Sequence, residues 1–111
     1  MLNHREKRRY VAIMYEESGT YRPFQLHERI GIRYKELFGI FQMQSAMLKL
    51  YDSEFGNIMI VRCKLKYLDY FLVSVVLSEP SLTVISISGT LKRLRKNISK
   101  MDFRNIKNIR S

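Results

Sequence analysis

The sequence predicts one α+β domain, because segments with the two-residue repeat of strands alternate with segments that have the repeat of helices. The chain has 111 residues, enough for one modest core, and 46% of them are hydrophobic, which argues against disorder. The predicted order is strand, helix, strand, strand, helix, strand and a further basic helix. We expect residues 1–111 to form a single domain, with a basic arm at 1–9, a neutral α/β body at 10–91, and a basic helix and tail at 92–111.

The body is expected to begin with a strand at residues 10–15, which are rich in strand-forming side chains and end at an acidic turn. A helix follows from Pro23, since proline is tolerated in a first helical turn, and Gly39 is expected to end it. Its buried face should be formed by the apolar residues that recur at helical spacing, Leu26, Ile30, Tyr34 and Leu37.

The second half should contain two antiparallel strands, at 43–51 and 57–64, then a helix at 66–79 that Pro80 ends, and a last strand at 81–88. Short helical connections between strands favour a ferredoxin-like α/β sandwich, which RNA-recognition domains also use, with helices on one face of the sheet.

Two of the predicted strands are apolar at positions that face both sides of the sheet, at 58–61 and 82–87. A sheet with one face in water alternates more cleanly between apolar and polar residues. We therefore expect the second face to be covered by the C-terminal helix, by a partner, or by both.

The last strand leads into a Ser88-Gly89-Thr90 turn and then into a helix. Gly89 permits the change of direction, and Ser88 or Thr90 can cap the helix by accepting a hydrogen bond from a free amide. Such a terminus beside cations attracts anions, phosphate above all, although the same turn also fits an ordinary capped connection. The apolar stripe of this helix is Leu91, Leu94, Ile98 and Met101, and its cations fall largely on other faces.

The formal net charge of +10 is concentrated at the two ends of the chain. Residues 1–9 sum to +3 and residues 92–111 to +7, whereas residues 10–91 sum to zero. This pattern is typical of a protein that neutralises a polyanion at defined places, and nucleic acid is the first candidate; a solubilising surface is the alternative. No stretch approaches the roughly 20 apolar residues of a membrane span, and the N-terminus lacks a cleavable signal, so we expect a cytoplasmic protein.

Motifs for catalysis are absent from the sequence. The carboxylates are scattered, no phosphate loop or metal-ligand spacing occurs, and we expect neither an autonomous active site nor a metal site. Cys63 lies between Arg62 and Lys64, which could lower the pKa of its thiol, but an ordinary buried strand residue is the favoured interpretation. The predicted strand at 57–64 has no aromatic residue, so recognition of phosphate and shape is favoured over base stacking on an open sheet.

Five short runs, in order, carry a resemblance to a known family: RYVA at 9–12, LFG at 37–39, LKLYD at 48–52, IVRC at 60–63 and SGTLKRL at 88–94. Together they resemble the small protein subunit of archaeal ribonuclease P, protein component 2, which the eukaryotic enzyme shares. The resemblance covers nearly all of residues 5–100. Its most specific feature is VRC followed some 25 residues later by SGTLKRL.

The resemblance implies a non-catalytic subunit of a ribonucleoprotein in which the RNA, with Mg²⁺, removes the 5′ leader from precursor tRNA. It implies no cofactor on the protein, and as partners ribonuclease P RNA, precursor tRNA, a TIM-barrel protein subunit and a possible second copy of the chain. Combined with the charge distribution, it gives the expected RNA-binding residues Arg8, Arg9, Arg62, Ser88, Thr90, Lys92, Arg93, Arg95 and Lys96. Another RNA- or ribosome-associated module of the same fold is the alternative. A ligand-sensing ferredoxin-like domain is the rival from another class, although such a domain has no need of a tail with a charge of +7.

Overall fold

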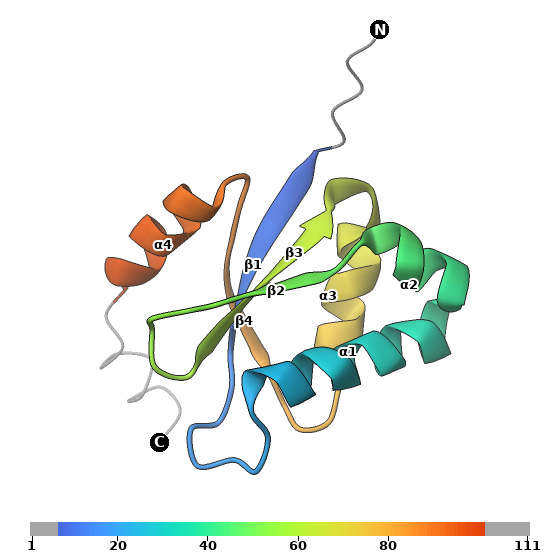
Figure 1. Ribbon diagram of the computed structural model, residues 1–111, viewed down its shortest axis with the longest axis horizontal. Helices are drawn as coiled ribbons and strands as arrows, with labels where there is room; N and C mark the ends of the chain where they lie inside the picture. The colour runs from blue at the N-terminus through green and yellow to red at the C-terminus, as the bar shows by residue number, and fades with distance from the viewer. Residues whose placement is uncertain (1–6, 102–111) are drawn as a thin grey trace, which may run out of the picture.

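A four-stranded antiparallel sheet organises residues 7–101, the part of the chain that the computed structural model describes (Figure 1). Its strands are β1 (Arg8–Met14), β2 (Lys49–Tyr51), β3 (Ile58–Lys64) and β4 (Thr83–Ser88), in the spatial order β2-β3-β1-β4. Every neighbouring pair is antiparallel, with β1 between β3 and β4. This order confirms the predicted ferredoxin-like arrangement.

Helices cover both faces of this sheet (Figure 1). On one face lie α1 (Pro23–Phe38), α2 (Ile40–Ala46) and α3 (Leu68–Val76), the last preceded by the 3₁₀ turn η1 (Leu65–Tyr67). On the other face lies α4 (Leu91–Ser99), the predicted C-terminal basic helix. The molecule therefore has three layers, and both faces of its sheet are buried where the helices pack.

Alternate residues of the strands enter two separate cores. In β1, Val11 and Ile13 face α1 and α3, whereas Ala12 and Met14 face α4, and all four are buried. The side chains of the central strand β3 alternate in the same way between the two cores. This division explains why strands of the sheet are apolar at positions on both faces. It shows that α4 covers part of the second face, over Ala12, Met14, Ile58 and Ile60.

The first helix confirms most of its predicted face. Pro23 stands in the first turn, and Leu26, Ile30 and Tyr34 are buried. Leu37 is 41% exposed instead, so that part of the prediction is wrong. The apolar face of the helix continues instead from Tyr34 to Phe38, four residues further along. The ring of Phe38 packs edge-on against the ring of Tyr34, with centroids 5.6 Å apart, and against the ring of Tyr70, with centroids 4.8 Å apart.

The strand expected at 43–51 is mostly a helix, since residues 40–46 form α2 and only Lys49–Tyr51 form β2. Gly39, with φ of 91°, ends α1 in a conformation that favours glycine, and its carbonyl accepts a hydrogen bond from the Met43 amide at 3.1 Å, which starts α2 at once. Met43 and Ala46, three residues apart, then pack on the same core. The prediction of a strand is therefore wrong over 43–46, because the three-residue spacing of Met43 and Ala46 belongs to a helix and not to the two-residue alternation of a strand.

The other elements differ from expectation at their ends. The second predicted helix, expected at 66–79, is α3 over 68–76, with η1 before it. It stops short of Pro80, because the residue before a proline is disfavoured in the helical conformation. Strand β4 begins at Thr83 rather than 81, and β1 spans 8–14 rather than 10–15. The predicted tail beyond 101 and the arm before 7 lie outside the described residues.

The thiol of Cys63 is buried in the core between the sheet and α1, as the favoured interpretation held. Burial raises its pKa to about 12, the opposite of the lowering that the neighbouring cations could have produced.

We expect the native thiol to be almost unreactive toward a disulfide reagent at about pH 8, and to react once urea unfolds the chain, because only the unfolded thiol is accessible and partly ionised. The free energy of unfolding should also fall as the pH rises above 9, where the unfolded thiol ionises and the folded one stays protonated. Rapid stoichiometric labelling of the native protein would contradict the buried site.

Candidate RNA-binding surface

The connection between β4 and α4 is a capped turn. Thr90 Oγ1 accepts a hydrogen bond from the Arg93 amide at 3.2 Å, so Thr90 is the N-cap of α4. Ser88 is buried, and its Oγ accepts a bond from the Thr90 amide at 3.5 Å. Both hydroxyls that the sequence singled out thus have partners within the turn, and the cations of the helix are the groups left open to an anion.

The amphipathic pattern of α4 directs its cations away from the sheet. Leu94 and Ile98 are fully buried against the core that Ala12 and Ile60 line. The opposite side of the helix carries the exposed residues Lys92, Arg93, Lys96 and Lys100. Lys92, Lys96 and Lys100 lie four residues apart and form one ridge with steps of about 6 Å. Lys100 was missing from the expected site, although this four-residue spacing is visible in the sequence.

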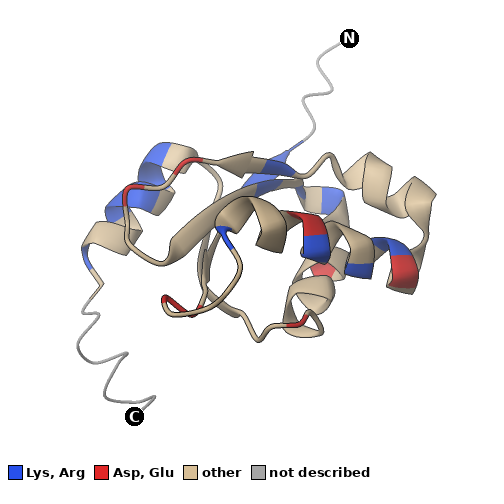
Figure 2. Cartoon of the chain, turned by 60° about the horizontal axis from the view of Figure 1, so that its bottom comes forward, with Lys and Arg blue, Asp and Glu red and all other residues tan. Residues whose placement is uncertain are grey.

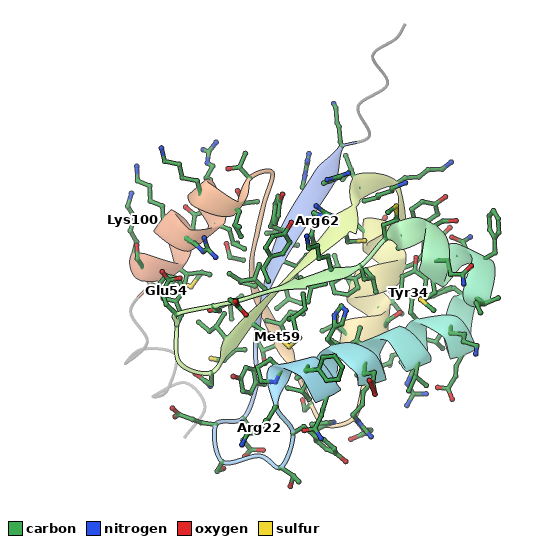
Figure 3. The ribbon with its side chains drawn as sticks, viewed as in Figure 1. Arg22, Tyr34, Glu54, Met59, Arg62 and Lys100 are labelled. Atoms are coloured by element: carbon green, nitrogen blue, oxygen red, sulfur yellow. The ribbon has the colours of Figure 1, made fainter. Side chains whose placement is uncertain are left out.

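Arg95 points differently from the other cations of α4. Its Nη2 donates to the Asp52 carbonyl at 3.1 Å, and its Nε lies 3.6 Å from the Glu54 carboxylate. Both partners belong to the turn between β2 and β3, beside α4 (Figure 3). Arg95 therefore holds α4 to this turn, and part of its charge is already balanced.

The cations at the start of β1 lie beside the turn that begins α4, although some 80 residues separate them in the sequence. Arg9 donates to the Arg8 carbonyl at 2.9 Å, and a methyl group on Gly89 would lie 3.6 Å from Nη1 of Arg9. The antiparallel pairing of β1 with β4 brings these segments together. Figure 2 shows Lys and Arg gathered on α4 and at the start of β1.

Arg62 lies on the same side of the sheet as α4. In β3 it stands opposite Tyr10 of β1, a residue that packs against the core under α4. Its Nη1 donates to the Tyr51 hydroxyl at 3.0 Å, and the side chain remains partly exposed. We define the basic surface as the cations at this end of the sheet and on α4: Arg8, Arg9, Arg62, Lys92, Arg93, Lys96 and Lys100. Arg9 starts from the other face, since it pairs with Cys63, and reaches this surface at the sheet edge beside Gly89.

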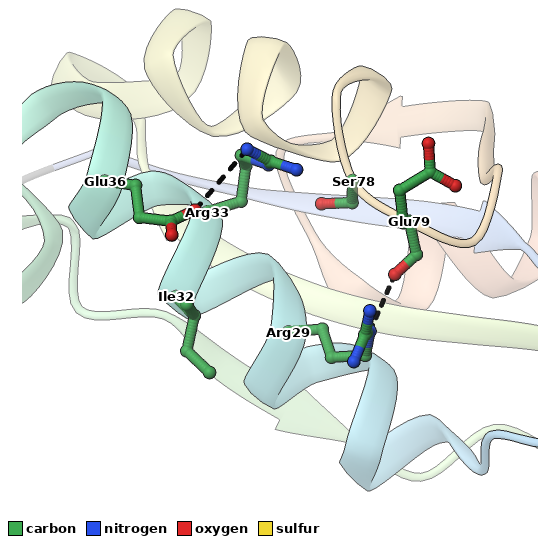
Figure 4. Close-up of a pocket in the computed structure, with 6 residues that line it drawn as sticks. All are labelled: Arg29, Ile32, Arg33, Glu36, Ser78 and Glu79. Carbon is green, nitrogen blue, oxygen red and sulfur yellow. Dashed lines mark hydrogen bonds and ion pairs between the residues drawn. The ribbon is translucent and has the colours of Figure 1, made fainter.

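A cavity of about 220 Å³ lies on the opposite side of the sheet, between α1 and the loop after α3 (Figure 4). Arg29 there donates to the Glu79 carbonyl at 2.6 Å and stacks over the Tyr21 ring at 4.6 Å, and Arg33 pairs with Glu36 at 3.4 Å. Both arginines already have partners in the protein: Arg29 ties the loop to α1, and Arg33 pairs within α1 itself.

Within residues 7–101, no three His, Cys, Asp or Glu side chains gather in a way that could hold a metal ion. No helix of this described part is long and apolar enough to cross a membrane. His27 lies on α1, where burial lowers its pKa and the charge of Glu28 acts in the other direction. The basic surface is therefore the feature on which a functional proposal can rest.

The fold and this surface define a class: a small ferredoxin-like α+β protein with a cationic helix docked on the second face of its sheet. No protein-family model and no curated protein matches the sequence. Among solved structures, the chain is similar to one in the cryo-EM structure of yeast ribonuclease MRP, with a TM-score of 0.61 and 11% identity over 96% of this chain and 98% of that one. At this identity the likeness concerns the fold, and the sequence comparisons lend no support to the archaeal family in particular.

Proposed function

We propose that the chain is a non-catalytic, RNA-binding subunit of an RNA-processing ribonucleoprotein, and more specifically of a ribonuclease P that removes the 5′ leader from precursor tRNA. The observation that carries the proposal is the ridge of cations on α4, held outward by a buried apolar stripe. The end-to-end fold likeness to a chain of yeast ribonuclease MRP supports the same class of assembly. The finer assignment rests on the five short runs that resemble protein component 2, to which the family and curated-protein comparisons add nothing.

The role that this geometry suits is electrostatic. Lys and Arg side chains on a rigid, docked helix contact RNA phosphates and release the counterions condensed there. The repulsion between phosphate strands then falls, so a catalytic RNA folds and engages its substrate at a lower Mg²⁺ concentration. In this role the metal ions and the cleavage chemistry belong to the RNA.

A protein partner has a separate surface available. The sheet face expected as an interface is occupied by α4, whereas the outer sides of α1, α2 and α3 carry exposed apolar residues. Phe24, Phe41 and Val76 are 66%, 78% and 68% exposed. We assign contact with the TIM-barrel subunit to this outer helical surface on the basis of these exposed side chains.

Reconstitution tests the proposal. The purified chain alone should leave precursor tRNA intact at every Mg²⁺ concentration. Mixed with the catalytic RNA of its own cell and the TIM-barrel subunit, it should raise the rate of 5′ leader removal and shift the Mg²⁺ optimum downward. Mg²⁺-dependent cleavage by the RNA-free protein, lost on a point substitution in this chain, would overturn the non-catalytic role.

A further inference from the structure

Part of the sheet face next to α4 is not covered by that helix. The core under α4 is formed by Ala12, Met14, Ile58 and Ile60, toward the end of β1 and the start of β3. Toward the other end of these strands, Lys49, Arg62 and Tyr10 stand opposite one another across β2, β3 and β1. Lys49 is exposed, and Arg62 and Tyr10 are partly exposed, so this row is open to solvent.

Two aromatic rings and two cations meet in this area. The rings of Tyr10 and Tyr51 contact each other edge to face, with centroids 5.7 Å apart and an interplanar angle of 67°. Nζ of Lys49 lies 5.2 Å, and Cζ of Arg62 5.8 Å, from the centroid of the Tyr51 ring. We name these four residues the tyrosine cluster (Figure 3 labels Arg62).

The surroundings of the cluster favour an anionic ligand. The four strands contain no acidic residue, and Arg8 lies one row further along the same face. The nearest acids in sequence are Asp52 and Glu54. Arg95 pairs with the Glu54 carboxylate and contacts Asp52 only through its backbone carbonyl, and among the described residues neither acid forms an ion pair with Lys49 or Arg62. Rings beside unbalanced cations match a nucleotide, whose flat base stacks on an aromatic side chain while its phosphate pairs with Lys or Arg.

We propose that the tyrosine cluster binds one unpaired RNA nucleotide, with its base stacked on Tyr51 or Tyr10 and its phosphate held by Arg62 and Lys49. An unpaired nucleotide is required, because a base inside a duplex has no free face to offer a ring. The inference rests on the proposed RNA-binding function and adds a site that reads single strands beside the phosphate-binding ridge of α4. It also revises the expectation against base stacking: β3 itself has no aromatic residue, but β1 and β2 bring theirs to its flanks.

The test uses the full-length chain and a single-stranded RNA of about ten uridines, with a blunt RNA duplex of equal length for comparison. Tyr51→Leu should weaken binding of the single strand by roughly 5- to 150-fold, the range expected for loss of one stacked base. Binding of the duplex should stay unchanged, and Tyr51→Phe, which keeps the ring, should retain most of the affinity. The salt dependence should not change, since no charge is removed.

Tyr21→Leu is the matched control, because Tyr21 also carries a cation over its ring, Arg29, but lies on the opposite side of the sheet. It should bind the single strand as the wild type does. A folded Tyr51→Leu protein with wild-type affinity for the single strand would overturn the site, and so would equal losses for single strand and duplex.

A second measurement needs no variant and therefore does not depend on the stability of Tyr51→Leu. The wild-type chain is cross-linked by light to the same oligomer carrying 5-iodouridine, and the modified peptide is identified by mass spectrometry. Cross-links at Tyr51 or Tyr10 support the proposal, and cross-links confined to α4 overturn it. Failure of the cluster leaves the ridge of α4 and the reconstitution test untouched, whereas failure of reconstitution with an intact cluster indicates a different RNA-binding module.

Discussion

Replacing Lys92, Arg93, Lys96 and Lys100 by alanine should remove most of the affinity of the chain for its RNA at low salt. Each lost phosphate contact lowers the log–log salt slope by somewhat less than one, so four contacts lower it by about three units. Because the electrostatic contribution vanishes toward about 1 M salt, this slope corresponds to roughly a thousandfold loss of affinity at about 0.1 M. The measurement is RNA binding at a series of salt concentrations.

The control removes the same charge from the opposite side of the sheet, with alanine at Arg22, Arg29, Arg33 and Lys35. If only the net charge of the protein mattered, both variants would lose affinity equally. Binding through the basic surface instead leaves the control with nearly the wild-type slope. A wild-type slope for the α4 variant would show that the ridge does not contact phosphate.

Leu94→Ala should destabilise the protein by about 2–5 kcal/mol, because a fully buried leucine leaves both lost contacts and a cavity. The substitution removes no charge. It should nevertheless weaken RNA binding, since α4 presents its cations only while its apolar stripe is docked on the sheet. Urea unfolding and RNA binding of the same preparation measure the two effects.

Leu37→Ala provides the matched control for this substitution. Leu37 is also a helical leucine but is 41% exposed on α1, away from the basic surface. Its replacement should lower the free energy of unfolding by less than about 1 kcal/mol and leave RNA binding unchanged. Equal stability of the two variants would contradict the docking of α4.

The sequence predicted the features that depend on local spacing. The three-and-four-residue repeat of Leu91, Leu94 and Ile98 gave the buried stripe of α4, and the helix start at Pro23 followed from the backbone preference of proline. The apolar residues at 58–61 and 82–87, in and next to β3 and β4, indicated two covered faces. In these cases a single element carries the whole signal, so no knowledge of its neighbours is required.

Features that depend on pairing between distant segments were missed. The strand predicted at 43–51 is wrong over 43–46, which belong to α2, because the sequence indicates Gly39 only as the end of one helix and not as the start of the next. Arg95 was grouped with the RNA-binding cations, and its contacts with the β2–β3 turn follow only from the docking of α4. The meeting of Tyr10 with Tyr51 requires the strand register, which no local pattern contains.

The most direct measurement is the identity of the RNA that co-purifies with the tagged chain from its own cells. If the chain is a ribonuclease P subunit, the captured complex should contain one RNA of several hundred nucleotides and several small basic proteins, and should remove 5′ leaders from precursor tRNA in Mg²⁺. The RNA should be lost when Lys92, Arg93, Lys96 and Lys100 of the α4 segment are replaced. Capture of ribosomal RNA alone, or of a complex without leader-removing activity, would contradict the account.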